Sequence, residues 1–248
     1  MMDGSAFIKE TEFKLLEIDA FLRLVVFSYY QLVKDSKVYR RAEILETIKR
    51  VTESEDAHNE IEDYLCDDLV DNYIRPNKHL FGLQYYAVNT GVKESKENVK
   101  IGILDLKFEL CTLAKDHYYV FEAKRIDKYS VKQNYYIDHG IQRFTKRTYY
   151  PESNVTVAGM IGFVEVDLTK FPKGKAVIAD IYKKLGTRLS SKTHIKTNRP
   201  LEIYHLKDSD SKEVNDFEHS YVSGHLRNDN VPFTIHHLLL DYYEILEN

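Results

Sequence analysis

The stretch that decides the fold reads VKIGILDLKFEL at residues 99–110 and YYVFEAKRI at residues 118–126. Alternate side chains of a β-strand point to opposite faces. One face of the first segment would be apolar and consist of Leu104, Leu106, Phe108 and Leu110. The other would consist of Ile101, Ile103, Asp105, Lys107 and Glu109. With a turn at Asp116-His117, the sequence predicts two neighbouring strands.

Both predicted strands carry charges that an ordinary core does not require. Asp105 interrupts an apolar run, and Glu122 and Lys124 are two residues apart, so they share one face of their strand. If Asp105 faces the same side, two carboxylates and an ammonium group converge. Two adjacent carboxylates repel each other unless a cation lies between them. A Mg²⁺ ion, which prefers oxygen ligands, fits that role.

This arrangement suits the hydrolysis of a phosphodiester, whose negative charge resists attack by hydroxide. A bound metal ion activates water and supports the leaving oxygen. Asp105, Glu122 and the carbonyl of Ala123 are the predicted ligands, and Lys124 is predicted to orient the water and stabilise charge. The alternative is a cross-strand ion pair at a sheet edge, worth about 0.2–1 kcal/mol and without chemistry.

The remaining pattern predicts one domain over residues 1–248, with a helical part at about 1–78 and a core at about 79–248. Residues 11–34 suit either a strand followed by a helix or one helix. Further helices are expected at 38–51, 55–74, 131–148 and 175–189, and further strands at 80–90, 155–167, 201–206 and 233–240. The predicted class is α/β, with a mixed central β-sheet flanked by helices.

Asp105 followed by Glu122-Ala123-Lys124 resembles the PD-(D/E)XK nuclease superfamily. The likeness covers about residues 99–167 and includes Gly140-Ile141-Gln142-Arg143-Phe144, Tyr149-Tyr150 and the strand Ala158 to Val164, with a weaker match at 234–240. Leu104 stands where the family often has proline. The resemblance implies a restriction endonuclease-like core.

The resemblance also implies further site residues. Gln142 and Arg143 match positions on a helix that faces the scissile phosphate, and Gln142 is therefore predicted to be catalytic. The family tends to add an acid from an N-terminal helix to the metal site. Glu60 is the preferred candidate here, with Glu62 and Asp63 beside it and Glu43 or Glu46 as rivals.

The expected activity is therefore Mg²⁺-dependent cleavage of DNA, with Mn²⁺ as a substitute, in the manner of restriction or anti-phage defence nucleases. A second defence-system subunit and further copies of the chain are candidate partners. Two alternatives are an inactive nuclease-fold module that binds nucleic acid or a protein, and a toxin-like protein whose acidic helix at 55–74 covers a basic cleft.

Charge is unevenly distributed along a chain whose net charge is −4. Acids fill residues 53–72, whereas bases dominate residues 170–199. Near the motif, the predicted nucleic-acid contacts are Arg125, Arg143, Lys146 and Arg147. Arg143 and Arg147 would share a helix face. The alternative in each case is a solvated basic surface.

Several other functions lack their sequence signals. No glycine-rich phosphate loop and no Gly-x-Ser-x-Gly turn is present. The histidines, among them His225, show no zinc spacing with the two cysteines, and a surface position is expected for His225. Few cysteines, no signal peptide and no long apolar run predict a cytoplasmic protein without membrane contact.

Overall fold

The chain builds a seven-stranded mixed β-sheet. The computed structural model describes residues 4–52, 60–96, 99–111, 118–150, 155–166, 174–206 and 217–247. The strand order is β2-β3-β4-β5-β8-β7-β6. The strands are β2 (Tyr86–Lys96), β3 (Val99–Leu110), β4 (Tyr118–Ile126), β5 (Val157–Val164), β6 (Lys196–Ile203), β7 (Ser220–Leu226) and β8 (Pro232–Asp241).

The sheet has a parallel centre and antiparallel edges. The central strands β4, β5 and β8 pair in parallel, and the outer pairs β2–β3, β3–β4, β8–β7 and β7–β6 are antiparallel. A small parallel sheet joins β1 (Tyr39–Arg40) to β9 (Leu246–Glu247). The prediction of an α/β class with a mixed central sheet is confirmed.

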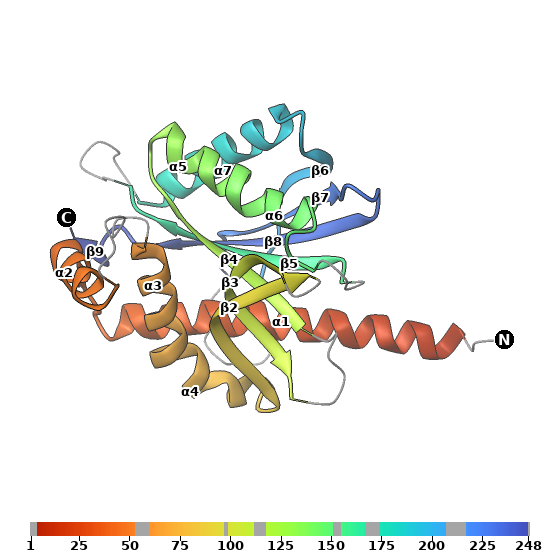
Figure 1. Cartoon of the computed structure of the whole chain (residues 1–248), viewed down its shortest axis with the longest axis horizontal. Helices are drawn as coiled ribbons and strands as arrows, with labels where there is room; N and C mark the ends of the chain where they lie inside the picture. Colours follow the sequence, from red (N-terminus) through yellow and green to blue (C-terminus); the bar gives the residue numbers. More distant parts are fainter. Residues whose placement is uncertain are drawn as a thin grey trace.

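Helices cover both faces of the sheet (Figure 1). One face carries α1 (Gly4–Lys34), α2 (Arg41–Thr52), α3 (Ile61–Leu69), the π-helix η1 (Val70–Ile74), α4 (Arg75–Asn77) and the 3₁₀-helix η2 (Lys78–Phe81). The other carries α5 (Ser130–Tyr135), the π-helix η3 (Tyr136–Ile141), α6 (Gln142–Thr145) and α7 (Gly174–Ser191). Each helical layer packs on its own apolar cluster.

Residues 11–34 belong to the single helix α1. Its central part is buried on several sides, because Leu22, Leu24, Val25 and Val26 are all inaccessible to solvent. Phe21 stacks on Phe108 of β3, with ring centroids 4.6 Å apart. Contact with the sheet therefore explains the apolar run in residues 11–34, for which the sequence allowed either one helix or a strand followed by a helix.

The strands that carry the motif alternate as expected. Leu104, Leu106 and Phe108 of β3 are fully buried, whereas Ile103, the residue before them on the opposite face, is 40% exposed. In β4, every residue from Tyr119 to Ile126 is buried, because helices cover both faces of this central strand. The predicted turn at Asp116-His117 lies outside the described residues.

Several element predictions are wrong in detail. The helix predicted at 55–74 is α3 up to Leu69 and then a π-helix, and the one predicted at 131–148 consists of α5, η3 and α6 and ends at Thr145. Residues 80–85 form a 3₁₀ turn and loop before β2. The strand expected at 201–206 is β6, and β7 was not predicted.

The π-helix η3 brings the backbone close to the sheet. A Cβ atom on Gly140 would lie 2.3 Å from Cε of Met160 and 3.7 Å from Cγ of Lys124. A side chain at this position would therefore require the flexible end of Met160 to move. The extra residue of a π turn is a common feature of functional sites.

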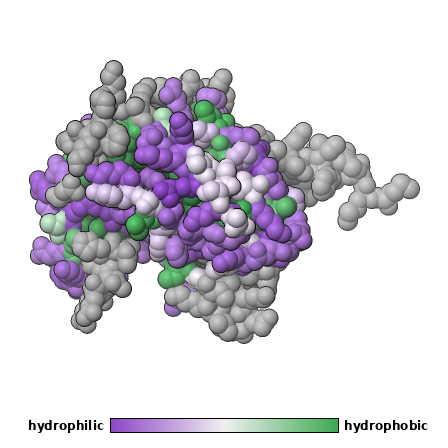
Figure 2. All heavy atoms as spheres, turned by 90° about the horizontal axis from the view of Figure 1, so that it is seen from above, coloured by the Kyte–Doolittle hydropathy of each residue, from purple (hydrophilic) through white to green (hydrophobic). Residues whose placement is uncertain are grey.

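The surface over α5 to α7 is mainly hydrophilic, with only scattered apolar side chains among the described residues (Figure 2). No helix in the described part of the chain combines the length and the apolar character needed to cross a membrane.

Candidate active site

The site begins where β3 and β4 separate. Their paired register runs from Glu109 and Tyr118 to Leu106 and Phe121. Beyond that point the Asp105 carboxylate fills the gap, and its Oδ2 accepts a hydrogen bond of 2.7 Å from the backbone N–H of Ala123. The separation of two strands therefore places an acid between them.

The Lys124 ammonium group lies at the centre of the site. Its Nζ is 2.6 Å from Glu122 Oε1, 2.6 Å from the carbonyl oxygen of Ala123 and 3.4 Å from Asp105 Oδ2. A fourth oxygen, Glu62 Oε1 from α3, is 2.9 Å away. The side chain of Lys124 is only 3% exposed. Three carboxylates and one carbonyl thus converge on a single buried cation.

Glu122 is held on both carboxylate oxygens. Oε1 is 2.9 Å from Nη1 of Arg143, and Oε2 accepts a 2.5 Å hydrogen bond from the Tyr149 hydroxyl. Burial and the nearby Asp105 raise the pKa of Glu122 to about 8, although Lys124 and Arg143 act in the opposite direction. Tyr149 and Arg143 therefore fix this carboxylate in a site rich in negative charge.

Helix α3 supplies the N-terminal acid. Glu62 contacts Lys124 and also lies 3.3 Å from the backbone nitrogen of Arg125. Burial, followed by the charges of Asp105 and Glu62, raises the pKa of the neighbouring Asp63 to about 7. Glu60, the preferred acid in the sequence, is the residue before α3 and makes no side-chain cap there. The acid that reaches the ammonium group is Glu62.

We call Asp105, Glu122, Glu62, Asp63 and Lys124 the carboxylate cluster. Its four acids face two cations, Lys124 and Arg143. The described residues contain no group of three or more His, Cys, Asp or Glu side chains already placed to hold a metal ion. The acidic oxygens surround the ammonium group instead. Burial and mutual repulsion raise the pKa of Glu122 and of Asp63, so Lys124 and Arg143 do not supply enough positive charge to keep all four acids ionised.

The other predicted site residues occupy different positions. Gln142 is half-buried at the start of α6, and its carbonyl oxygen accepts hydrogen bonds from the Lys146 backbone N–H and the Thr145 hydroxyl. Lys146 is exposed. Arg147 has a positive φ of 60° and pairs with Asp229 at 2.9 Å. The prediction that Arg143 and Arg147 share a helix face is wrong, because α6 ends at Thr145.

Arg125 belongs to a separate ion-pair network. Its guanidinium group binds Glu165, which also pairs with Arg41 at 2.6 Å and with Lys132 at 3.3 Å. These cations hold the pKa of Glu165 at about 2 in spite of its burial. The side chain of Arg125 is therefore committed to a structural network beside the cluster.

A second buried polar cluster lies between β7, β8 and η3. Hydrogen bonds join Tyr136 Oη to His237 Nδ1 at 2.8 Å, and the Ser223 hydroxyl to Nε2 of both His237 and His225 at 2.7 Å. All four side chains are buried. We call this group the histidine chain. The surface position expected for His225 is wrong, because the side chain has no solvent exposure.

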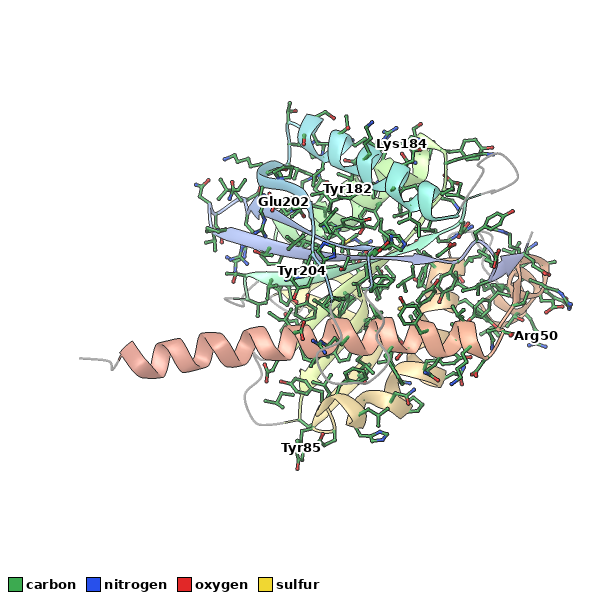
Figure 3. The ribbon with its side chains drawn as sticks, turned by 180° about the vertical axis from the view of Figure 1, so that it is seen from behind. Arg50, Tyr85, Tyr182, Lys184, Glu202 and Tyr204 are labelled. Atoms are coloured by element: carbon green, nitrogen blue, oxygen red, sulfur yellow. The ribbon has the colours of Figure 1, made fainter. Side chains whose placement is uncertain are left out.

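Part of the basic run in residues 170–199 is ion-paired where it is described. Lys184 pairs with Asp180, Lys192 with Asp138 and Arg199 with Glu202. Figure 3 shows Lys184 on the outer side of α7, away from the sheet. The number of bases in the sequence therefore overstates the unpaired positive charge of this run.

Tyr149 is the site residue that sequence reasoning missed. The pair Tyr149-Tyr150 was noted only as part of a family likeness, and no role followed from it. Its contact with Glu122 arises because the chain turns back after α6, where Tyr149 N–H donates to the Arg143 carbonyl at 3.1 Å. The available signal in the sequence was the pair of adjacent tyrosines directly after a predicted helix that carries a predicted phosphate contact.

No family model, no curated protein and no solved structure matches this chain.

Proposed function

We propose that the protein is a metal-dependent endonuclease that hydrolyses phosphodiester bonds of DNA. The observation that carries the proposal is the set of oxygens around Lys124. Asp105 Oδ2, Glu122 Oε1 and the Ala123 carbonyl, the three atoms predicted to bind Mg²⁺, lie within 3.4 Å of one buried cation. These three oxygens already surround one cation.

The donor set fits a divalent ion. A divalent ion would supply the positive charge that lets all four acids ionise, and Mg²⁺ and Mn²⁺ prefer carboxylate and carbonyl oxygens. Asp105, Glu122 and Ala123 would hold the ion, with Glu62 in the place expected for Glu60. The ion would polarise the phosphate and lower the pKa of a bound water.

The chain's own residues would do the rest of the chemistry. Lys124, released from the acidic oxygens, would orient the attacking water and stabilise charge on the phosphate. Arg143 is 32% exposed at the edge of the cluster and can bind a phosphate oxygen by a charge-assisted hydrogen bond. Tyr149 would hold Glu122 in place. Gln142, one residue from Arg143, would contact the substrate.

The fold is compatible with this proposal. The strands β3 and β4 that bear the motif are followed by the helical segment α5 to α6 and then by β5, parallel to β4. That order agrees with the restriction endonuclease-like core implied by the PD-(D/E)XK resemblance. A role in restriction or anti-phage defence, and a second protein subunit, rest on that resemblance alone.

The alternative is a nuclease-fold module without catalysis, which binds nucleic acid or a partner protein. The observation in its favour is that Lys124 already contacts one oxygen each of Asp105, Glu122 and Ala123. A permanent buried ion-pair cluster would have the same geometry. The two proposals differ in whether a divalent ion replaces the ammonium group.

The experiment compares cleavage of plasmid and single-stranded DNA, with Mg²⁺ or Mn²⁺, by the wild type and the Glu122→Gln variant. Glu165→Gln is the matched control, because Glu165 is an equally buried, ion-paired glutamate outside the cluster. We expect Glu122→Gln to lose roughly 100- to 1000-fold in rate, and Glu165→Gln to retain cleavage while folded. Equal rates for the wild type and Glu122→Gln would contradict the proposal.

A further inference from the structure

A line of exposed side chains runs along α5, η3 and α6 towards the carboxylate cluster. Val131, Tyr135, His139 and Arg143 follow one another at intervals of four residues through α5, η3 and α6. Tyr135 and His139 are in contact across the start of η3. The line ends at Arg143, whose Nη1 is 2.9 Å from Glu122.

Two aromatic rings form the middle of this line. The rings of Tyr135 and His139 stack with centroids 4.2 Å apart and planes 26° apart. Tyr135 is 44% exposed and Val131 is 74% exposed, and His139 is also exposed. A surface pair of this kind stabilises a helix by only about 0.2–0.5 kcal/mol. Stability alone gives little reason for these rings to lie open to solvent beside the cluster.

The charge next to the rings suits a nucleic-acid strand. Arg143 is the cation of the cluster with the most exposed side chain, at 32% against 3% for Lys124. Exposed Lys146 lies directly after the end of α6. A phosphate held at Arg143 would leave the base of a neighbouring nucleotide near the rings, the nearer of which belongs to His139, four residues before Arg143.

We propose that Tyr135 and His139 are a stacking platform for a base of single-stranded DNA whose phosphate lies at Arg143. This inference rests on the proposed nuclease function and names its substrate class. Aromatic side chains bind unpaired bases by stacking, with little dependence on sequence. The bases of an intact duplex stack on one another and offer no free face, so the platform selects single-stranded or frayed DNA.

The test measures binding of a short fluorescent single strand, and of the duplex of the same sequence, in Ca²⁺ so that cleavage is suppressed. The variants are Tyr135→Ala and Tyr135→Phe. Tyr85→Ala is the matched control, because Tyr85 is 69% exposed and lies far from Tyr182 and Lys184 of the α7 layer in Figure 3. Thermal melting of each variant confirms that it is folded.

We expect Tyr135→Ala to weaken single-strand binding by about 5- to 100-fold, the range for loss of one stacked base. Tyr135→Phe and Tyr85→Ala should bind like the wild type, and duplex binding should change little in any variant. If the wild type cleaves DNA but folded Tyr135→Ala binds the single strand normally, the platform is overturned and the nuclease stands. If the wild type neither binds nor cleaves DNA, both proposals fail.

Discussion

The carboxylate cluster and the histidine chain are both buried polar groups on the central sheet, yet they differ in charge and access. The carboxylate cluster has more acids than cations, and its edge opens to solvent through Arg143 and Glu62. The histidine chain consists of neutral side chains that bond to one another and are sealed from solvent. The proposed metal site belongs to the first of these two groups.

Hydrogen bonding explains why the histidine chain is structural. Buried polar groups are tolerated when they bond to one another. Within the histidine chain, Ser223 is hydrogen-bonded to both histidines, and only Nδ1 of His225 lacks a partner among the described residues. In the carboxylate cluster the contacts are equally short, but burial and repulsion between the acids raise the pKa of Glu122 to about 8 and that of Asp63 to about 7. Several acids with raised pKa values in one place, rather than burial of polar atoms, therefore distinguish a candidate site.

The largest expected effect comes from removing the cation of the carboxylate cluster. Lys124→Met leaves buried acids without their partner and should destabilise the metal-free protein by about 3–5 kcal/mol. Mn²⁺ should restore part of that loss, because it supplies the missing positive charge, whereas cleavage should stay absent. Urea unfolding with and without Mn²⁺ measures this. The same destabilisation in both conditions would mean that the acids bind no metal.

An intermediate effect is expected when acid charges the histidine chain. Burial lowers the pKa of His225 to about 4 from 6.5, so its stabilising effect is present above pH 6.5 and is lost as the pH falls towards 4. Between pH 7 and pH 5 this residue alone should cost about 2 kcal/mol of unfolding free energy. Urea unfolding at both pH values, with EDTA present, measures the loss.

His225→Gln is the control for that experiment. The variant should be less stable at pH 7 but should lose less stability than the wild type on acidification. A pH dependence identical to that of the wild type would show that His225 is not the group that titrates.

The smallest effect is expected on the outer face of α7. Lys184 pairs with Asp180 four residues away, and both side chains are more than 40% exposed. Lys184→Ala should therefore change stability by less than about 0.5 kcal/mol. It should also leave DNA affinity unchanged, because this charge is already paired. A clear loss of DNA binding would show that the basic run at 170–199 contributes to the DNA interface.

The two strands of the motif could be predicted because their pattern is local. Alternation of Leu104, Leu106 and Phe108 with polar residues fixes the faces of β3, and the structure confirms it. Strand β7 could not be predicted, since its Ser223 and His225 are polar in the sequence but are buried, with Ser223 hydrogen-bonded to both His225 and His237. Its Gly224 lies against Arg199, where an added Cβ would be 3.2 Å from that side chain.

The candidate site could be predicted only in part, because some of its features depend on tertiary structure rather than on a local pattern. Asp105, Glu122 and Lys124 follow from strand alternation, and the structure brings them together around one ammonium group. The choice between Glu60 and Glu62 depends on where α3 begins, which the acidic run does not reveal. The π-helix η3, which sets Gly140 against Lys124, has no sequence signal comparable to a cap or a proline.

The most direct test of the central claim is whether Asp105 and its neighbours bind a divalent ion. Thermal unfolding of the wild type and of Asp105→Asn is followed with increasing Mn²⁺ or Mg²⁺. At ten times the dissociation constant, the ion should stabilise the wild type by about 1.4 kcal/mol, or roughly 3–5 °C for a chain of this size. The account predicts that this shift disappears in Asp105→Asn; no shift in the wild type, or an equal shift in both, would contradict it.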